Sequence, residues 1–199
     1  MLLGTSWATA WWWAIGGSVL LLVGAMLALR SDGPGWALAA VGLLPVVVFP
    51  SLIGHASGAE ARWIAVGLDV VHVAAGGAWI GTLGLIVLVG RSWLDRIVPP
   101  FSAIALGSVV ALVVTGGVAG WRLVGSLEGY VGTPYGRTLL LKVVLFLGVA
   151  MIGALNWRRL RPRLGSPGGD VAMGRSASAE FVLGQVVLLV TAVLVRMAP

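Results

Sequence analysis

Six long apolar stretches dominate this chain, and each has the length that a helix needs to cross a lipid bilayer. A spanning helix requires about 20 predominantly apolar residues. The stretches lie at residues 7–29, 36–53, 63–89, 101–124, 137–157 and 178–195. Pro45 and Pro50 are expected to kink the second stretch, and Pro99-Pro100 to precede the fourth. The pattern predicts an all-α fold, a polytopic membrane helical bundle of about six transmembrane helices, forming a single integral membrane domain over residues 1–199.

The composition supports lipid as the environment of this chain. Hydrophobic residues make up 59% of it and charged residues only 10%, whereas soluble domains carry about 25% charged residues. The 30 Gly residues fit closely packed membrane helices. The net charge of +6 lies mostly in short loops, so we attribute it to membrane topology and not to nucleic acid. The expected partner is the lipid bilayer.

The loop charges predict the orientation. The first, third and fifth loops contain more Arg than the opposite side, and loop five contributes most of the excess, with Arg158, Arg159, Arg161, Arg163 and Arg175. Cytoplasmic loops carry the excess of Lys and Arg in membrane proteins. We therefore expect these loops in the cytoplasm and both termini on the periplasmic side.

Two histidines are the strongest candidates for a metal site. The chain has no Cys, so a metal would need His, carboxylate, Met or backbone ligands. His55 is predicted at the outer end of the second helix. His72 is predicted about 13 Å into the third helix, counting from Trp63 at 1.5 Å per residue. Because a short loop joins these helices, the two side chains are expected to approach each other, with His55 above His72.

Polar residues near His72 are candidates for supporting roles. Asp69 lies one turn before His72 on the same helix face, and Trp79 lies seven residues after it. An Asp beside a His can hold the imidazole tautomer that a metal requires. The alternative is a proton-linked pair that ties the second and third helices together. Glu60 in the outer loop is a candidate carboxylate for ion capture, and Lys142 either snorkels or pairs with Asp69.

Two further polar residues are interpreted as structural. Glu180 is predicted to open the sixth helix at the inner face, where it caps the helix N-terminus or pairs with the arginines of loop five. Asn156 is predicted at the inner end of the fifth helix. The Met residues form no ladder of the kind that a thioether copper(I) relay would need.

A series of short motifs follows in order over residues 50–196. It comprises Gly54-His55-Ala56, Asp69-Val70-Val71-His72-Val73-Ala74-Ala75-Gly76-Gly77-Ala78-Trp79-Ile80-Gly81, Phe101-Ser102, Thr115-Gly116, Thr133-Pro134-Tyr135-Gly136-Arg137-Thr138-Leu139-Leu140-Leu141-Lys142, Asn156-Trp157-Arg158-Arg159-Leu160, and Glu180 with Thr191-Ala192. In their order and spacing these motifs resemble the copper-resistance D (CopD) family.

The resemblance implies a bacterial inner-membrane protein of copper homeostasis and resistance that moves copper from the periplasm to the cytoplasm. His55 and His72 match the family's His positions and are the expected copper ligands. The expected supporting residues are Asp69, Trp79, Tyr135 and Lys142. This chain is shorter than other family members, so a separate periplasmic copper chaperone is expected, and the small number of helices favours a homodimer.

Two other functions stay open. A b-type membrane cytochrome would use His55 and His72 as axial ligands of haem b, although the two residues are predicted at different depths. A membrane assembly partner would deliver copper to another protein, such as an oxidase. The sequence contains no hydrolytic nucleophile–base pair and no HExxH motif, so we do not expect an enzyme.

Overall fold

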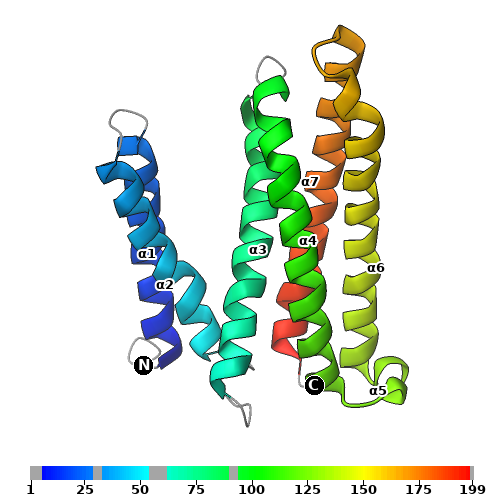
Figure 1. Ribbon diagram of the computed structural model, residues 1–199. Coiled ribbons are helices and arrows are strands. Elements are labelled where there is room, and N and C mark those ends of the chain that lie inside the picture. The colour runs from blue at the N-terminus through cyan, green and yellow to red at the C-terminus, as the bar shows by residue number, and fades with distance from the viewer. Residues whose placement is uncertain (1–5, 29–32, 54–61, 90–93, 198–199) are drawn as a thin grey trace. The chain divides into compact units, whose positions relative to one another are not determined.

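The computed structural model describes residues 6–28, 33–53, 62–89 and 94–197 (Figure 1). These residues are almost entirely helical, and no strand occurs among them. Six of their helices are long and apolar enough to cross a membrane. The predicted all-α, polytopic fold is therefore confirmed. The chain forms two compact units, residues 1–74 and 75–199.

The first unit contains two complete helices and the beginning of a third. They are α1 (Ser6–Ala28), α2 (Pro34–Ile53) and the first part of α3 (Arg62–Val89). The helices α1 and α2 form an antiparallel hairpin (Figure 1). Their backbones meet at glycines: a Cβ atom added to Gly24 would lie 2.3 Å from the Ala39 nitrogen, and one added to Gly42 would lie 2.4 Å from the Leu21 nitrogen. Small residues of this kind let membrane helices approach closely.

The second unit contains the remainder of α3 and all the elements that follow. They are α4 (Leu94–Val124), the short α5 (Leu127–Gly132), α6 (Pro134–Leu155), a π-helix (Asn156–Leu160), a 3-10 helix (Arg161–Arg163) and α7 (Pro167–Arg196). The helices α6 and α7 pack against each other in antiparallel directions. Within this unit, α5 and the C-terminal end of α7 lie at one end of the helices, and the π-helix lies at the opposite end (Figure 1).

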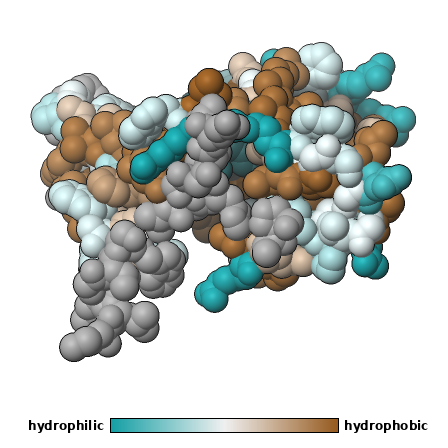
Figure 2. Space-filling model, turned by 90° about the horizontal axis from the view of Figure 1, so that it is seen from below, coloured by the Kyte–Doolittle hydropathy of each residue, from teal (hydrophilic) through white to brown (hydrophobic). Residues whose placement is uncertain are grey.

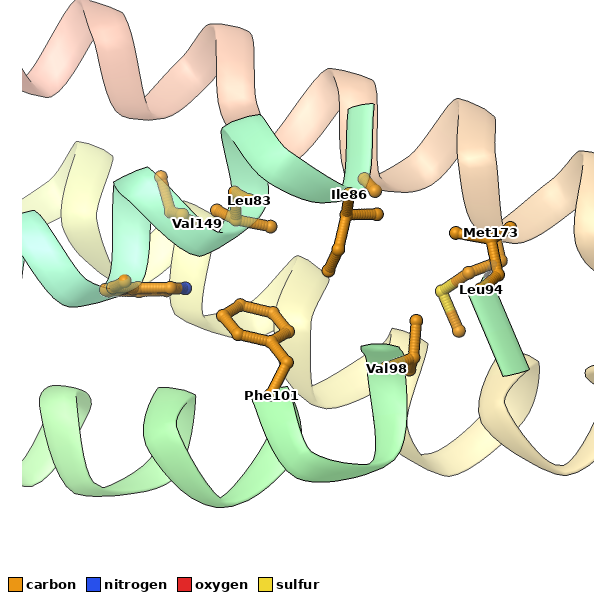
Figure 3. Close-up of a cluster of buried hydrophobic side chains, with 9 residues drawn as sticks. Leu83, Ile86, Leu94, Val98, Phe101, Val149 and Met173 are labelled. Atoms are coloured by element: carbon orange, nitrogen blue, oxygen red, sulfur yellow. The ribbon is translucent and has the colours of Figure 1, made fainter. Parts of the chain in front are cut away.

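An apolar core joins four helices of the second unit. It consists of Trp79, Leu83 and Ile86 from α3, Leu94, Val98 and Phe101 from α4, Val149 from α6, and Met173 and Ala177 from α7. In Figure 3 the side chains of Ile86 and Phe101 extend toward each other from α3 and α4. Glycine again brings helices close, because a Cβ atom added to Gly84 of α3 would lie 3.2 Å from the Phe181 ring of α7. The core thus fixes α3 against α7.

Two helices begin more than one full turn earlier than the sequence analysis predicted. The helix α4 begins at Leu94 and continues through Pro99 and Pro100. Two prolines so near a helix start interrupt only the hydrogen bonds of its first turns. The helix α7 begins at Pro167, whereas the prediction placed its start at residue 178. Ser166 caps it, since its hydroxyl accepts the N–H of Gly169 at 3.2 Å.

The Ser166 cap offers a modest test of this early start. Replacing Ser166 with alanine is expected to lower the free energy of unfolding by about 1 kcal/mol, because one N–H of the first turn loses its acceptor. Ser166→Asp keeps an acceptor and should retain most of the stability. Chemical unfolding of the purified protein, followed by circular dichroism, measures both. An equal loss in the two variants would contradict the cap.

Large apolar side chains remain exposed on the outer faces of the second unit. Leu106 on α4 is 68% exposed and Leu189 on α7 is 67% exposed. Figure 2, which views the molecule from below, shows hydrophobic residues on the surface among the polar ones. Water would penalise such a surface, whereas lipid chains cover it without cost. The surface therefore agrees with a membrane-spanning chain.

Candidate functional site

The expected imidazole–carboxylate pair lies on α3. Asp69 and His72 are one turn apart on this helix, and both side chains are partly buried. His55 and Glu60 lie outside the described residues, so the expected approach of His55 to His72 stays a prediction. Within the described ranges, no group of three or more His, Cys, Asp and Glu side chains is arranged to hold a metal ion. The metal-binding roles of His72 and Asp69 therefore stay predictions.

Tyr135 and Lys142 lie near the start of α6. Tyr135 is buried, with 4% of its surface exposed, and Lys142 is partly buried two turns farther along. Thr133 caps the helix by accepting the N–H of Gly136 at 2.9 Å. A Cβ atom added to Gly136 would lie 2.2 Å from the carbonyl oxygen of Gly129 in α5. The Thr-Pro-Tyr-Gly motif therefore shapes the turn between α5 and α6.

Trp79 belongs to a buried polar cluster that sequence reasoning did not assemble. Its indole N–H donates to Oε1 of Glu180 on α7 at 3.2 Å. The Asn156 amide, at the end of α6, donates to Oε2 of the same carboxylate at 3.0 Å. The Ser176 hydroxyl donates in turn to the Asn156 side-chain oxygen at 2.5 Å. We call these four residues the Glu180 cluster.

Close packing surrounds the Glu180 carboxylate. Only 3% of Glu180, 4% of Trp79 and 8% of Asn156 is exposed. The Phe146 ring of α6 meets the Trp79 ring edge-on, with centroids 5.6 Å apart. At Gly153 the backbone of α6 passes so near that an added Cβ atom would lie 3.1 Å from Oε1. The cluster thus joins α3, α6 and α7 through one carboxyl group.

Removing a carboxylate from water costs several kcal/mol unless partners compensate. A hydrogen bond to a charged group contributes about 1.5 to 3 kcal/mol in soluble proteins, and bonds between membrane helices average about 0.6 kcal/mol. The two donors therefore offset only part of the cost. Acidic residues at such positions in membrane helices commonly serve a function.

The structure corrects the interpretation of Glu180. We expected this residue to open the last helix, but α7 begins at Pro167 and Glu180 lies near the middle of its 30 residues. It neither caps the helix nor pairs with the arginines of the fifth loop, and its hydrogen-bond donors are Trp79 and Asn156. The Ser166-Pro167 step followed by Asp170 is a typical helix start. Reading that pattern would have placed Glu180 inside the helix.

Comparison with known proteins yields one family and one curated relative. The sequence profile of the family described as Copper resistance protein D matches residues 95–194. The chain is 26% identical over 163 residues to a protein named Copper transport protein CutJ from Bacillus subtilis (strain 168). The aligned region covers 75% of this chain and 29% of that protein, so the chain spans less than a third of its relative's length. No solved structure matches the chain.

The family match includes α4, the α5–α6 turn and most of α7, and therefore includes Asn156 and Glu180. It extends over half of the chain, and it agrees with the resemblance found in the ordered motifs. The chain belongs to the Copper resistance protein D family.

Proposed function

We propose that this protein binds copper and carries it across the bacterial inner membrane, inward, as part of copper homeostasis. Membership of the Copper resistance protein D family and similarity to a protein named for copper transport support this function. The observation that carries the site is the Asp69–His72 pair on a membrane-spanning helix. Imidazole is a good ligand for copper, and a carboxylate one turn away can orient it or balance the charge of the ion.

In this proposal His55 captures the ion at the outer side and His72 receives it. The chain contains no Cys, so the ligands are imidazole and oxygen donors, with Glu60 as a further carboxylate at the outer side. A periplasmic copper chaperone supplies the ion, and a homodimer is the transporting unit. Copper is the transported substrate in this proposal, and the ligands bind it transiently.

The first test is the loss of copper from a His72 variant. His72→Ala is expected to weaken copper binding at least tenfold, because loss of a partner around a metal typically costs about 10- to 100-fold in affinity. Asp69→Asn should give a smaller loss of the same kind. The measurement is a copper titration of the purified full chain in detergent, together with copper accumulation in cells that express each variant.

Val71→Ala provides the matched control, because Val71 is a neighbour on the same turn and is 47% exposed. Its copper binding should equal that of the parent protein. Unchanged copper binding and accumulation in His72→Ala would refute the assignment of His72. A visible spectrum of the same sample tests the haem alternative. A Soret band that is present in the parent protein and absent in His72→Ala would refute copper transport and indicate a b-type cytochrome.

A further inference from the structure

Glu180 is a buried carboxylate that lacks a positively charged partner among the described residues. Its partners are the neutral N–H groups of Trp79 and Asn156. Within the described ranges, no Lys, Arg or His nitrogen lies within 4.0 Å of the carboxylate. Its negative charge is therefore not balanced by an ion pair within this part of the chain.

Several arginines on the elements around Glu180 lie at exposed positions. Arg158 and Arg159 of the π-helix, Arg175 of α7 and Arg96 of α4 are all exposed. Lys142 lies on α6 three turns from Gly153, the residue whose backbone approaches the carboxylate. The residue of α3 that contacts the carboxylate is Trp79, and its indole group does not titrate. The carboxyl group is thus the titratable centre of the cluster.

A proton is the cation that this site can accept with its present groups. A metal ion would need several converging ligands, and no such group exists in the described residues. A carboxylate offers about four lone-pair positions, of which the two N–H donors occupy two. A proton can therefore attach to either oxygen while both existing hydrogen bonds remain.

One end of the cluster is less deeply buried than the carboxylate. Ser176 is only partly buried and donates to Asn156, which in turn donates to Glu180. Asn156 begins the π-helix at the end of α6. Single turns of π-helix are often found at functional sites. The chain of hydrogen bonds thus leads from Ser176 on α7, through Asn156 at the start of the π-helix, to the carboxylate.

We propose that the carboxyl group of Glu180, held between Trp79 and Asn156, is a proton-exchange site that couples proton release to copper passage. The O–H bond breaks with its electron pair left on the carboxylate oxygen, and the proton passes to water at the Ser176 side as a positive ion enters the membrane interior. Reprotonation by water follows when the ion departs. The coupling rests on the proposed copper transport, whereas the proton site itself does not.

Infrared spectroscopy of the copper-free full chain in liposomes tests the proton site alone. We expect the carbonyl stretch of a protonated carboxyl group that appears and disappears as the pH is varied. This band should be absent in Glu180→Gln and unchanged in Glu128→Gln, the control at an exposed carboxylate of α5. No titrating band in the parent protein, or the same band in Glu180→Gln, would overturn the proposal.

Proteoliposomes with a trapped pH indicator test the coupling. Copper added to the parent protein should change the proton concentration on the side of the membrane where the loop between α6 and α7 lies, and Glu180→Gln should lose this proton signal. Copper uptake without proton movement in the parent protein would overturn the coupling and leave copper transport intact. Absence of copper uptake by the parent protein would overturn the proposed function and its coupling, and the infrared experiment would still decide whether Glu180 exchanges a proton.

Discussion

Replacing Trp79 with alanine is expected to lower the free energy of unfolding by about 3 to 5 kcal/mol, the usual cost of deleting a buried Trp side chain. Trp79 is 4% exposed, belongs to the apolar core, and contacts the Phe146 ring. Its truncation opens a cavity between α3, α6 and α7 and removes the donor to Glu180 at the same time. Thermal unfolding of the purified protein in detergent measures the loss.

Two further variants separate packing from hydrogen bonding at Trp79. Trp79→Phe keeps a buried aromatic ring but removes the indole N–H and part of the ring volume. We therefore expect a loss greater than the about 0.6 kcal/mol of an average hydrogen bond between membrane helices, and smaller than the loss in Trp79→Ala. Trp121→Ala is the matched control, because Trp121 lies on α4 and is 56% exposed. Its effect should stay within about 0.5 kcal/mol. Equal losses in Trp79→Ala and Trp121→Ala would contradict the role of Trp79 in the core.

The sequence predicted the transmembrane helices because hydrophobic length depends on local composition alone. It predicted less about where helices begin, since that depends on individual capping groups. Pro99 and Pro100 suggested a helix start, yet α4 runs through both. The start of α7 was missed because the segment from Pro167 to Ser178 is less apolar than the rest of the helix, although Ser166 caps it.

The candidate site, too, could be predicted from the sequence only in part. Asp69 and His72 were predicted on one helix from their spacing, and α3 carries both. The Glu180 cluster could not be predicted by spacing, because Trp79, Asn156 and Glu180 are distant in sequence and meet only through packing. Nor did polarity alone indicate it, since an acidic residue beside a basic loop equally favours a cap or an ion pair. Because α7 begins at Pro167, Glu180 lies inside the helix, and its partners are Trp79 and Asn156.

One of the close helix contacts in the first unit leads to the second large effect. Replacing Gly24 with leucine is expected to force α1 and α2 apart, because an added Cβ atom would lie 2.3 Å from the Ala39 nitrogen and 2.8 Å from its Cα. Overpacking usually costs about 1 to 3 kcal/mol, and we expect at least the upper value here. The obstructing atoms are backbone, which cannot move aside as a flexible side chain can.

Thiol cross-linking reports directly on the α1–α2 distance, since the natural chain has no Cys. Trp13 and Phe49 stack with ring centroids 5.4 Å apart, so Trp13→Cys with Phe49→Cys should react efficiently with a short bifunctional reagent. Adding Gly24→Leu should reduce the yield strongly, and Gly24→Ala should reduce it less. Gly16→Leu is the control. Gly16 lies on the same helix as Gly24, and an added Cβ atom at Gly16 meets nothing within 4 Å. If Gly24→Leu cross-links as well as Gly16→Leu does, glycine is not what sets the spacing of this hairpin.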